Sequence, residues 1–183
     1  MIAIQELENE HEAIKLSISL LDRIMEKLLT DPGTEQTDHL EGLLDFFQIF
    51  VDKCHHGKEE DFLFPALEKT GVQKQDGPIG VLLTEHETGR RYISQLKSQI
   101  PALRKADPRE TTTANKLVKS YTALMQQHIK KEETILFPLA DARLSEKEQI
   151  ALFREFENLE TEKIGPGRHE AFHDMLKKLS SLY

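Results

Sequence analysis

A motif of eleven residues occurs twice in this chain and constrains its fold more than any other feature. Residues 55–65 read HHGKEEDFLFP and residues 128–138 read HIKKEETILFP, with identical residues at seven of the eleven positions and an offset of 73. A shorter echo precedes each copy, because EHE occurs at 10–12 and again at 85–87, with an offset of 75. The order of the motifs is the same in both halves, which predicts two similar helical hairpins.

Apolar residues recur at spacings of three and four in the segments that carry these motifs. This periodicity predicts four long helices, over 2–29, 36–69, 79–105 and 109–142. The breaks between them contain typical stop and start residues: Asp31-Pro32-Gly33, the stretch 70–78, and Asp107-Pro108 with aspartate as N-cap and proline at the first helical position. Short connections of this kind predict antiparallel neighbours.

Two further helices are expected after residue 142. Ser145 and Glu148 form a capping-box pattern that opens a helix to about Lys163, and Gly165-Pro166-Gly167 separates it from a last helix ending near Tyr183. No alternating apolar run is bounded by hairpin turn residues. We therefore expect an all-α single domain over 1–183: an antiparallel up-down four-helix bundle (1–142) with two additional C-terminal helices (143–183).

Composition excludes several classes of function. The chain has 24 basic and 32 acidic residues, a net charge of −8, which argues against nucleic acid as a partner. No apolar run approaches the roughly 20 residues of a membrane span, and the first residues, MIAIQELENEHE, are too acidic for a signal peptide. A single cysteine, Cys54, suits a reducing compartment. We expect a cytoplasmic protein without a membrane partner.

Each copy of the long motif places a metal-binding pair on a helix. Residues four apart share a helix face, so His55 with Glu59 and His128 with Glu132 each direct an imidazole and a carboxylate toward one point. Two hairpins related by a pseudo-twofold axis would bring six ligands together: His11, His55, Glu59, His86, His128 and Glu132. Two carboxylates can bridge two ions while each ion takes two histidines, and this ligand set suits iron, manganese or zinc.

The neighbours of these residues are expected to support them. The helical repeat rotates Glu60 and Glu133 about 100° away from the ligands, toward solvent or a supporting position. Pro65 and Pro138 remove a backbone donor and are expected to bend the helix. His56 has Ile129 as its counterpart in the other copy, so we expect a polar neighbour rather than a ligand.

Taken together, these motifs resemble the hemerythrin-like, or HHE cation-binding, family over roughly residues 5–142. The resemblance rests on the motif EHE at 10–12 and 85–87 and on the motif HxxxEExxLFP at 55–65 and 128–138. The resemblance implies a four-helix bundle with a non-heme di-iron centre, an oxo or hydroxo bridge, and Glu59 and Glu132 as the bridging carboxylates. Arg90 stands where oxygen-carrying hemerythrins have a further histidine, which argues against reversible oxygen carriage.

Other patterns suggest competing readings. Residues 169–173 read HEAFH, as in zinc proteases, but the ten residues that follow contain no histidine or glutamate as a third ligand. A ferritin-like site would use Glu8 with His11 and Glu170 with His173 and leave the duplicated motif unexplained. The last helix could instead bring His169 or His173 to the metal pocket, although a surface position is the default. The acidic stretch 146–162 is expected to be a solvated helix face.

Three minor candidates are expected to be structural. Cys54 fits a small buried hydrophobic position, and Tyr92 and Tyr121 fit packing positions from which a hydroxyl could reach a bound ligand.

The functional prediction is a di-iron protein that binds or reacts with O2, NO or peroxide. The alternative is a non-enzymatic iron-binding or redox-sensor module that signals through helix packing. Carriers, sensors and enzymes share these ligands, so the sequence leaves the choice open, as it does the protein partner.

Overall fold

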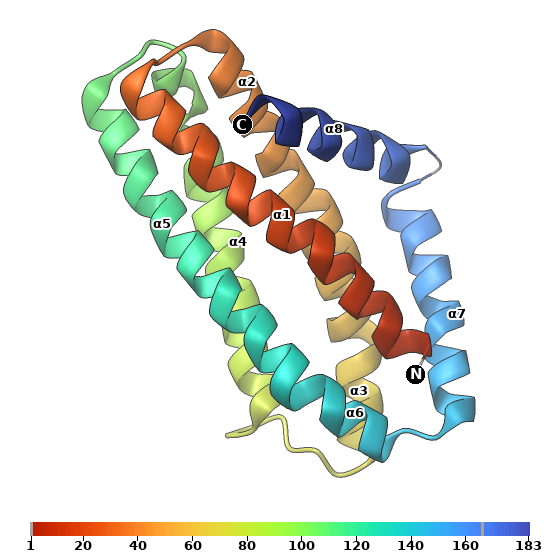
Figure 1. Ribbon diagram of the computed structural model, residues 1–183. Helices are drawn as coiled ribbons and strands as arrows, with labels where there is room; N and C mark the ends of the chain where they lie inside the picture. The colour runs from red at the N-terminus through yellow and green to blue at the C-terminus, as the bar shows by residue number, and fades with distance from the viewer. Residues whose placement is uncertain (1, 166) are drawn as a thin grey trace.

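The computed structural model describes residues 2–165 and 167–183, which are helical and contain no strand (Figure 1). The prediction of an all-helical chain is therefore confirmed. The elements in chain order are α1 (Ile2–Thr30), α2 (Thr34–Phe46), η1 (Phe47–His56), η2 (Glu59–Leu63), α3 (Phe64–Lys69), α4 (Pro78–Leu103), α5 (Pro108–Lys131), η3 (Glu132–Leu136), α6 (Phe137–Arg143), α7 (Glu146–Lys163) and α8 (Arg168–Leu182). The three η segments are π-helical turns, which continue the α-helices on either side into unbroken rods over 34–69 and 108–143.

Proline explains two of these π-helical turns. Pro65 and Pro138 cannot donate to the carbonyl four residues earlier, and their rings crowd that carbonyl. The helix forms a wider turn instead. In it, the amides of Phe64 and Phe137, the residues just before the prolines, donate to the carbonyls of Glu59 and Glu132, five residues earlier. Each wide turn therefore begins at the first glutamate of the HxxxEE motif. Turns of this kind are rare and occur frequently at functional sites.

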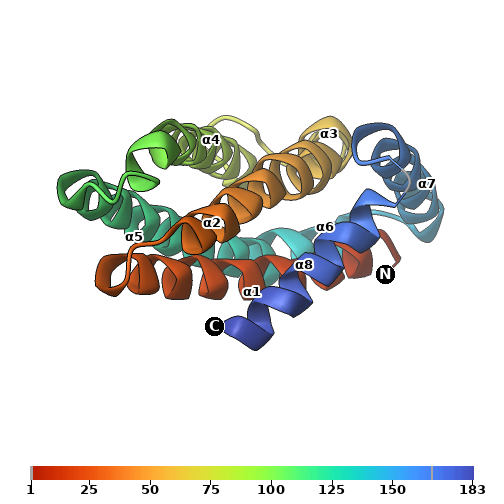
Figure 2. The ribbon, with the colours of Figure 1, turned by 90° about the horizontal axis from the view of Figure 1, so that it is seen from above.

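Four rods pack side by side in a ring: α4 lies along α5, α5 along α1, α1 along α2, and α2 along α4 (Figures 1 and 2). α7 and α8 lie on one side of this ring, where both contact α1 and α7 also contacts η1 and η2. The end of α8 is held by His39 of α2, whose Nδ1 lies 2.9 Å from the hydroxyl of Tyr183. The four rods thus enclose a core that α7 and α8 cover from one side.

The predicted helix ends are largely as expected. Asp107 caps α5 and accepts from the amides of Arg109 and Glu110, while Ser145 and Glu148 form the predicted capping box at the start of α7. Pro166, within the expected break before the last helix, lies outside the described residues. Among those residues, no helix is long and apolar enough to cross a membrane.

Candidate metal centre

All six predicted ligands meet in one buried layer, to which each of the four rods contributes. The residues, each at most 1% exposed, are His11 on α1, His55 on η1, Glu59 on η2, His86 on α4, His128 on α5 and Glu132 on η3. This layer lies between two apolar clusters, because each ligand-bearing rod contributes residues to one cluster before the ligand and to the other after it. The result is a buried layer of imidazoles and carboxylates with an apolar cluster on each side of it.

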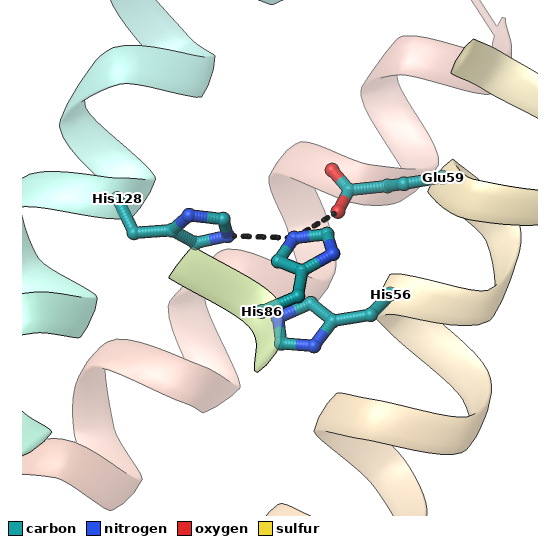
Figure 3. A group of neighbouring side chains, drawn as sticks. All are labelled: His56, Glu59, His86 and His128. Atoms are coloured by element: carbon teal, nitrogen blue, oxygen red, sulfur yellow. Dashed lines mark hydrogen bonds and ion pairs between the residues drawn. The ribbon is translucent and has the colours of Figure 1, made fainter. Parts of the chain in front are cut away.

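The side chains of the second half approach one another through their Nε2 atoms. His86 Nε2 lies 3.1 Å from His128 Nε2 and 3.4 Å from Glu59 Oε2 (Figure 3). Two imidazole nitrogens at this distance need a shared proton or a shared cation between them. His128 Nε2 is also 2.9 Å from Glu132 Oε1.

Each carboxylate reaches histidines of both halves with a different oxygen. Glu59 directs Oε1 toward His55 Nε2 at 3.9 Å and Oε2 toward His86 Nε2 at 3.4 Å. Glu132 directs Oε2 toward His11 Nε2 at 3.2 Å and Oε1 toward His128 Nε2 at 2.9 Å. A carboxylate placed in this way can bind one ion with each oxygen, which is what a bridging ligand requires.

In each of the four histidines predicted as ligands, the other ring nitrogen is held by a glutamate. His55 Nδ1 donates to Glu10 at 2.7 Å, and its counterpart His128 donates to Glu85 at 3.1 Å. The remaining two bonds are also counterparts, from His86 Nδ1 to Glu60 at 2.6 Å and from His11 Nδ1 to Glu133 at 3.0 Å. A carboxylate on Nδ1 fixes the tautomer that leaves Nε2 free to bind a metal.

Glu60 and Glu133 were predicted to face solvent or to take a supporting position. The structure gives them both features, because their side chains are 25% and 32% exposed and each accepts a hydrogen bond from a candidate ligand. Sequence reasoning missed the equivalent role of Glu10 and Glu85. Their signal was the first glutamate of each EHE echo, whereas the second glutamates, Glu12 and Glu87, are exposed.

Each of these four carboxylates also contacts a lysine or arginine side chain, and these basic residues again form pairs related by the repeat. Lys58 donates to Glu10 and Lys131 to Glu85. Arg90 donates to Glu60 at 2.6 Å, and Lys15 lies 2.8 Å from Glu133. Arg90, which marks the departure from the oxygen-carrying hemerythrins, therefore has a definite role here: with Lys15, 75 residues earlier, it holds the carboxylates that orient His86 and His11.

The buried atoms of the site fit a metal cofactor. Among the described residues, both carboxylate oxygens of Glu59 and of Glu132, and Nε2 of His11, are buried without a hydrogen-bond partner. Burying unpartnered polar atoms is unfavourable by a few kcal/mol each, unless a further group satisfies them. The donor atoms fall into two groups whose members lie within 4.8 Å of one another: His56, Glu59, His86 and His128 in one, and His11, His55 and Glu132 in the other.

His56 lies closer to the centre than its predicted role as a polar neighbour suggested. It is 4% exposed, and its ring stacks on His86 with 3.8 Å between the ring centroids (Figure 3). Neither ring nitrogen has a hydrogen bond, and the nearest carboxylate oxygen recorded, of Asp52, is 3.8 Å from Nδ1. Because Ile129 is the counterpart, this imidazole makes the two halves of the site unequal.

Without a bound cation, the buried charges shift the pKa values of the site strongly. Burial and then the charge of Glu132 raise the pKa of Glu59 to about 7. Burial acts to lower the pKa of His128, but the Glu132 carboxylate outweighs it and raises that pKa to about 9. Burial acts to lower the pKa of His86 as well, but the nearby carboxylates of Glu132 and Glu59 outweigh it and hold that pKa well above its ordinary value. Protons on these imidazoles thus stabilise the carboxylates of the metal-free protein.

Metal binding is therefore expected to release protons near neutral pH, including the one that His86 Nε2 and His128 Nε2 share, because a metal ligand must be deprotonated. Affinity should fall as the pH is lowered from about 8 to about 6, since Glu59 then also gains a proton. Titration with Zn2+ in a weak buffer containing an indicator dye measures the release directly. Proton release that is absent across this range would contradict the expectation.

Several residues considered in the sequence lie outside the centre. His169 and His173 contact each other on α8, and His169 Nε2 is 3.8 Å from Glu160 of α7, so neither belongs to the two donor groups. The ferritin-like pairing is not formed, because the donor groups contain neither Glu170 nor His173. Tyr121 is buried and packs edge-on against Phe47. Cys54 is buried, as predicted, and burial raises its pKa to about 12.

Fold and site together define a class of protein: an all-helical protein with buried groups of imidazoles and carboxylates that could hold metal ions. The chain belongs to the hemerythrin HHE cation binding domain family, whose model matches residues 2–140. It is also 23% identical over 170 residues to Uncharacterized protein Rv1995 of Mycobacterium tuberculosis and to Uncharacterized protein Mb2018 of Mycobacterium bovis. The matches cover 93% of this chain and 66% of each relative.

Proposed function

We propose that the protein holds two iron ions in an antiparallel up-down four-helix bundle and binds or reacts with O2, NO or peroxide there. The ligands are the six residues His11, His55, Glu59, His86, His128 and Glu132, with Glu59 and Glu132 as bridges. One observation carries the proposal: each of the four histidines in this set has its Nδ1 on a carboxylate, so that four Nε2 atoms and two unpartnered carboxylates converge in one buried layer. Such a layer is unfavourable without cations.

The iron pair supplies two one-electron redox centres with coordination positions left for a small ligand. The chain supplies the environment. Phe64 stacks on His86 and Phe137 stacks on His11, so each apolar ring covers a candidate ligand. The supporting glutamates fix the imidazole tautomers, and the apolar clusters above and below exclude water. Imidazole and carboxylate ligands also accept manganese and zinc, so metal analysis is part of the test.

A cavity supports access for a small ligand. It has a volume of about 240 Å³, lies between η1, α4 and α5, and has His56, Gly89 and Tyr121 in its wall. His56 separates the cavity from His86, against which it stacks. Diatomic molecules and peroxide fit this space easily.

Spectroscopy of the loaded protein tests this function. The protein is loaded anaerobically with ferrous iron, analysed for metal, and then exposed separately to O2, NO and hydrogen peroxide. We expect about two iron equivalents and new visible charge-transfer bands with at least one of these reagents. A protein that binds two equivalents but gives no bands with any reagent is not a gas or peroxide protein. One that retains far fewer than two equivalents has no di-iron centre.

The alternative function is an iron-dependent or redox-dependent sensor that acts through helix packing. The observation that favours it is the contact of α7 with η1 and η2, which carry two of the proposed ligands. Thermal stability that is independent of iron content and oxidation state would exclude a sensor of this type.

We also propose that 1–183 is one domain, in which the segment 143–183 is an appendage to the bundle.

A further inference from the structure

The two halves of the metal centre differ in how deeply their lysines are buried. Lys58 of the first half is 1% exposed, whereas the side chain of its counterpart Lys131 is 37% exposed. Both donate to the glutamate that holds a candidate ligand, Glu10 beside His55 and Glu85 beside His128. The repeat therefore places the same lysine in two environments, and something outside the repeat buries one of them.

Helix α7 makes this difference. Its Glu160 accepts from Lys58 Nζ at 3.2 Å. Phe156, one turn earlier on α7, is fully buried, and Lys58 Nζ lies 5.8 Å from its ring centroid. Leu159 of α7 packs close to the same turn, where a methyl group on Gly57 would meet it at 3.5 Å, an ordinary contact distance. Glu160 is thus an exception to the predicted solvated face over 146–162.

The result is a continuous chain of contacts from α7 to a candidate ligand. Glu160 contacts Lys58 at 3.2 Å, Lys58 contacts Glu10 at 2.5 Å, and Glu10 accepts from His55 Nδ1 at 2.7 Å. Glu10, Cys54 and Glu160 lie close enough to suggest a third metal site, but the ammonium group of Lys58 already supplies the cation there. In the second half, the described residues provide Lys131 with Glu85 and no equivalent of Glu160.

We propose that Glu160 is a positioning residue of the metal centre, which holds His55 through Lys58 and Glu10 and so makes α7 part of the site. This inference rests on the proposed metal binding and adds a regulatory element to it. With Glu160 present, Lys58 divides its charge among three carboxylates, those of Glu160, Glu10 and Glu6, which leaves Glu10 a stronger acceptor for His55 Nδ1. By linkage, a metal ion bound to His55 stabilises the docking of α7 to the same extent that docked α7 favours the metal.

Glu160→Gln tests the proposal, with Glu157→Gln as the matched control. Glu157 lies one turn earlier on the same helix and is exposed, so both variants remove one negative charge from α7. We expect Glu160→Gln to weaken the binding of one of the two metal equivalents about 10-fold in Zn2+ and anaerobic Fe2+ titrations, the lower end of effects for supporting groups. Glu157→Gln should bind both equivalents as the unchanged protein does.

Hydrogen exchange provides a second measurement, made first on the unchanged protein and then on the variant. Metal loading of the unchanged protein should slow amide exchange in α7, and Glu160→Gln should remove most of this response. Equal metal affinities for the two variants, or α7 exchange that ignores metal loading while two equivalents bind, would overturn the inference and leave the proposed function intact. A full chain that binds no metal overturns the proposed function and the inference together.

Discussion

Glu132→Gln is expected to abolish the paired metal centre. The amide keeps the size of the side chain but loses the negative charge and one of the two oxygens that face opposite halves of the site. Supporting groups typically change metal affinity 10–100-fold, so removal of a bridging carboxylate should exceed about 100-fold for the pair. Anaerobic loading followed by desalting and metal analysis should show a fall from about two iron equivalents to one or none.

The repeat provides both a replicate and a control for this experiment. Glu59→Gln changes the counterpart carboxylate and should produce the same loss. Glu87→Gln removes a glutamate beside the candidate ligand His86, but this side chain is exposed, so iron content and visible spectrum should be unchanged. Retention of two equivalents with an unaltered spectrum in Glu132→Gln would contradict the bridging role.

The six residues at the centre could be predicted because their signal is local and duplicated. Spacing of four on a helix places His55 with Glu59 and His128 with Glu132, and this relation survives the π-helical turns in which His55 and both glutamates lie. The remaining two histidines were found through the EHE echo. The helix ends were also readable, because caps such as Asp107 and Ser145 act through bonds to amides two or three residues away.

The supporting shell could not be predicted in the same way, because its contacts cross between rods. Glu10 holds a histidine of η1, and Glu133 holds one of α1, so their roles depend on how the rods are rotated against each other. A lysine at the fourth position of each long motif was visible as a repeated residue, but its partner was not. Glu160 had no sequence signal, since an inward-facing glutamate in an acidic helix resembles its solvated neighbours.

Lys58→Met should destabilise the metal-free protein by about 3 kcal/mol, because it leaves Glu10 buried without its counter-charge while the apolar stem still packs against Phe156. The matched variant Lys131→Met should change the free energy of unfolding by less than about 1 kcal/mol, since the side chain of Lys131 is 37% exposed. Urea denaturation of both metal-free variants measures the two values.

The pH dependence of the Lys58→Met defect identifies its cause. Burial already raises the pKa of Glu10, and Lys58 opposes that effect, so removal of the lysine should raise the pKa further. When the pKa of a carboxyl group is higher in the folded state than in the unfolded state, the folded protein is most stable at a pH where that group is protonated. The free energy of unfolding then falls as the pH rises above the unfolded pKa of 4.5. The deficit should therefore be smaller near pH 5 than near pH 7. A deficit that is equal at both pH values would indicate lost packing rather than an uncompensated charge on Glu10.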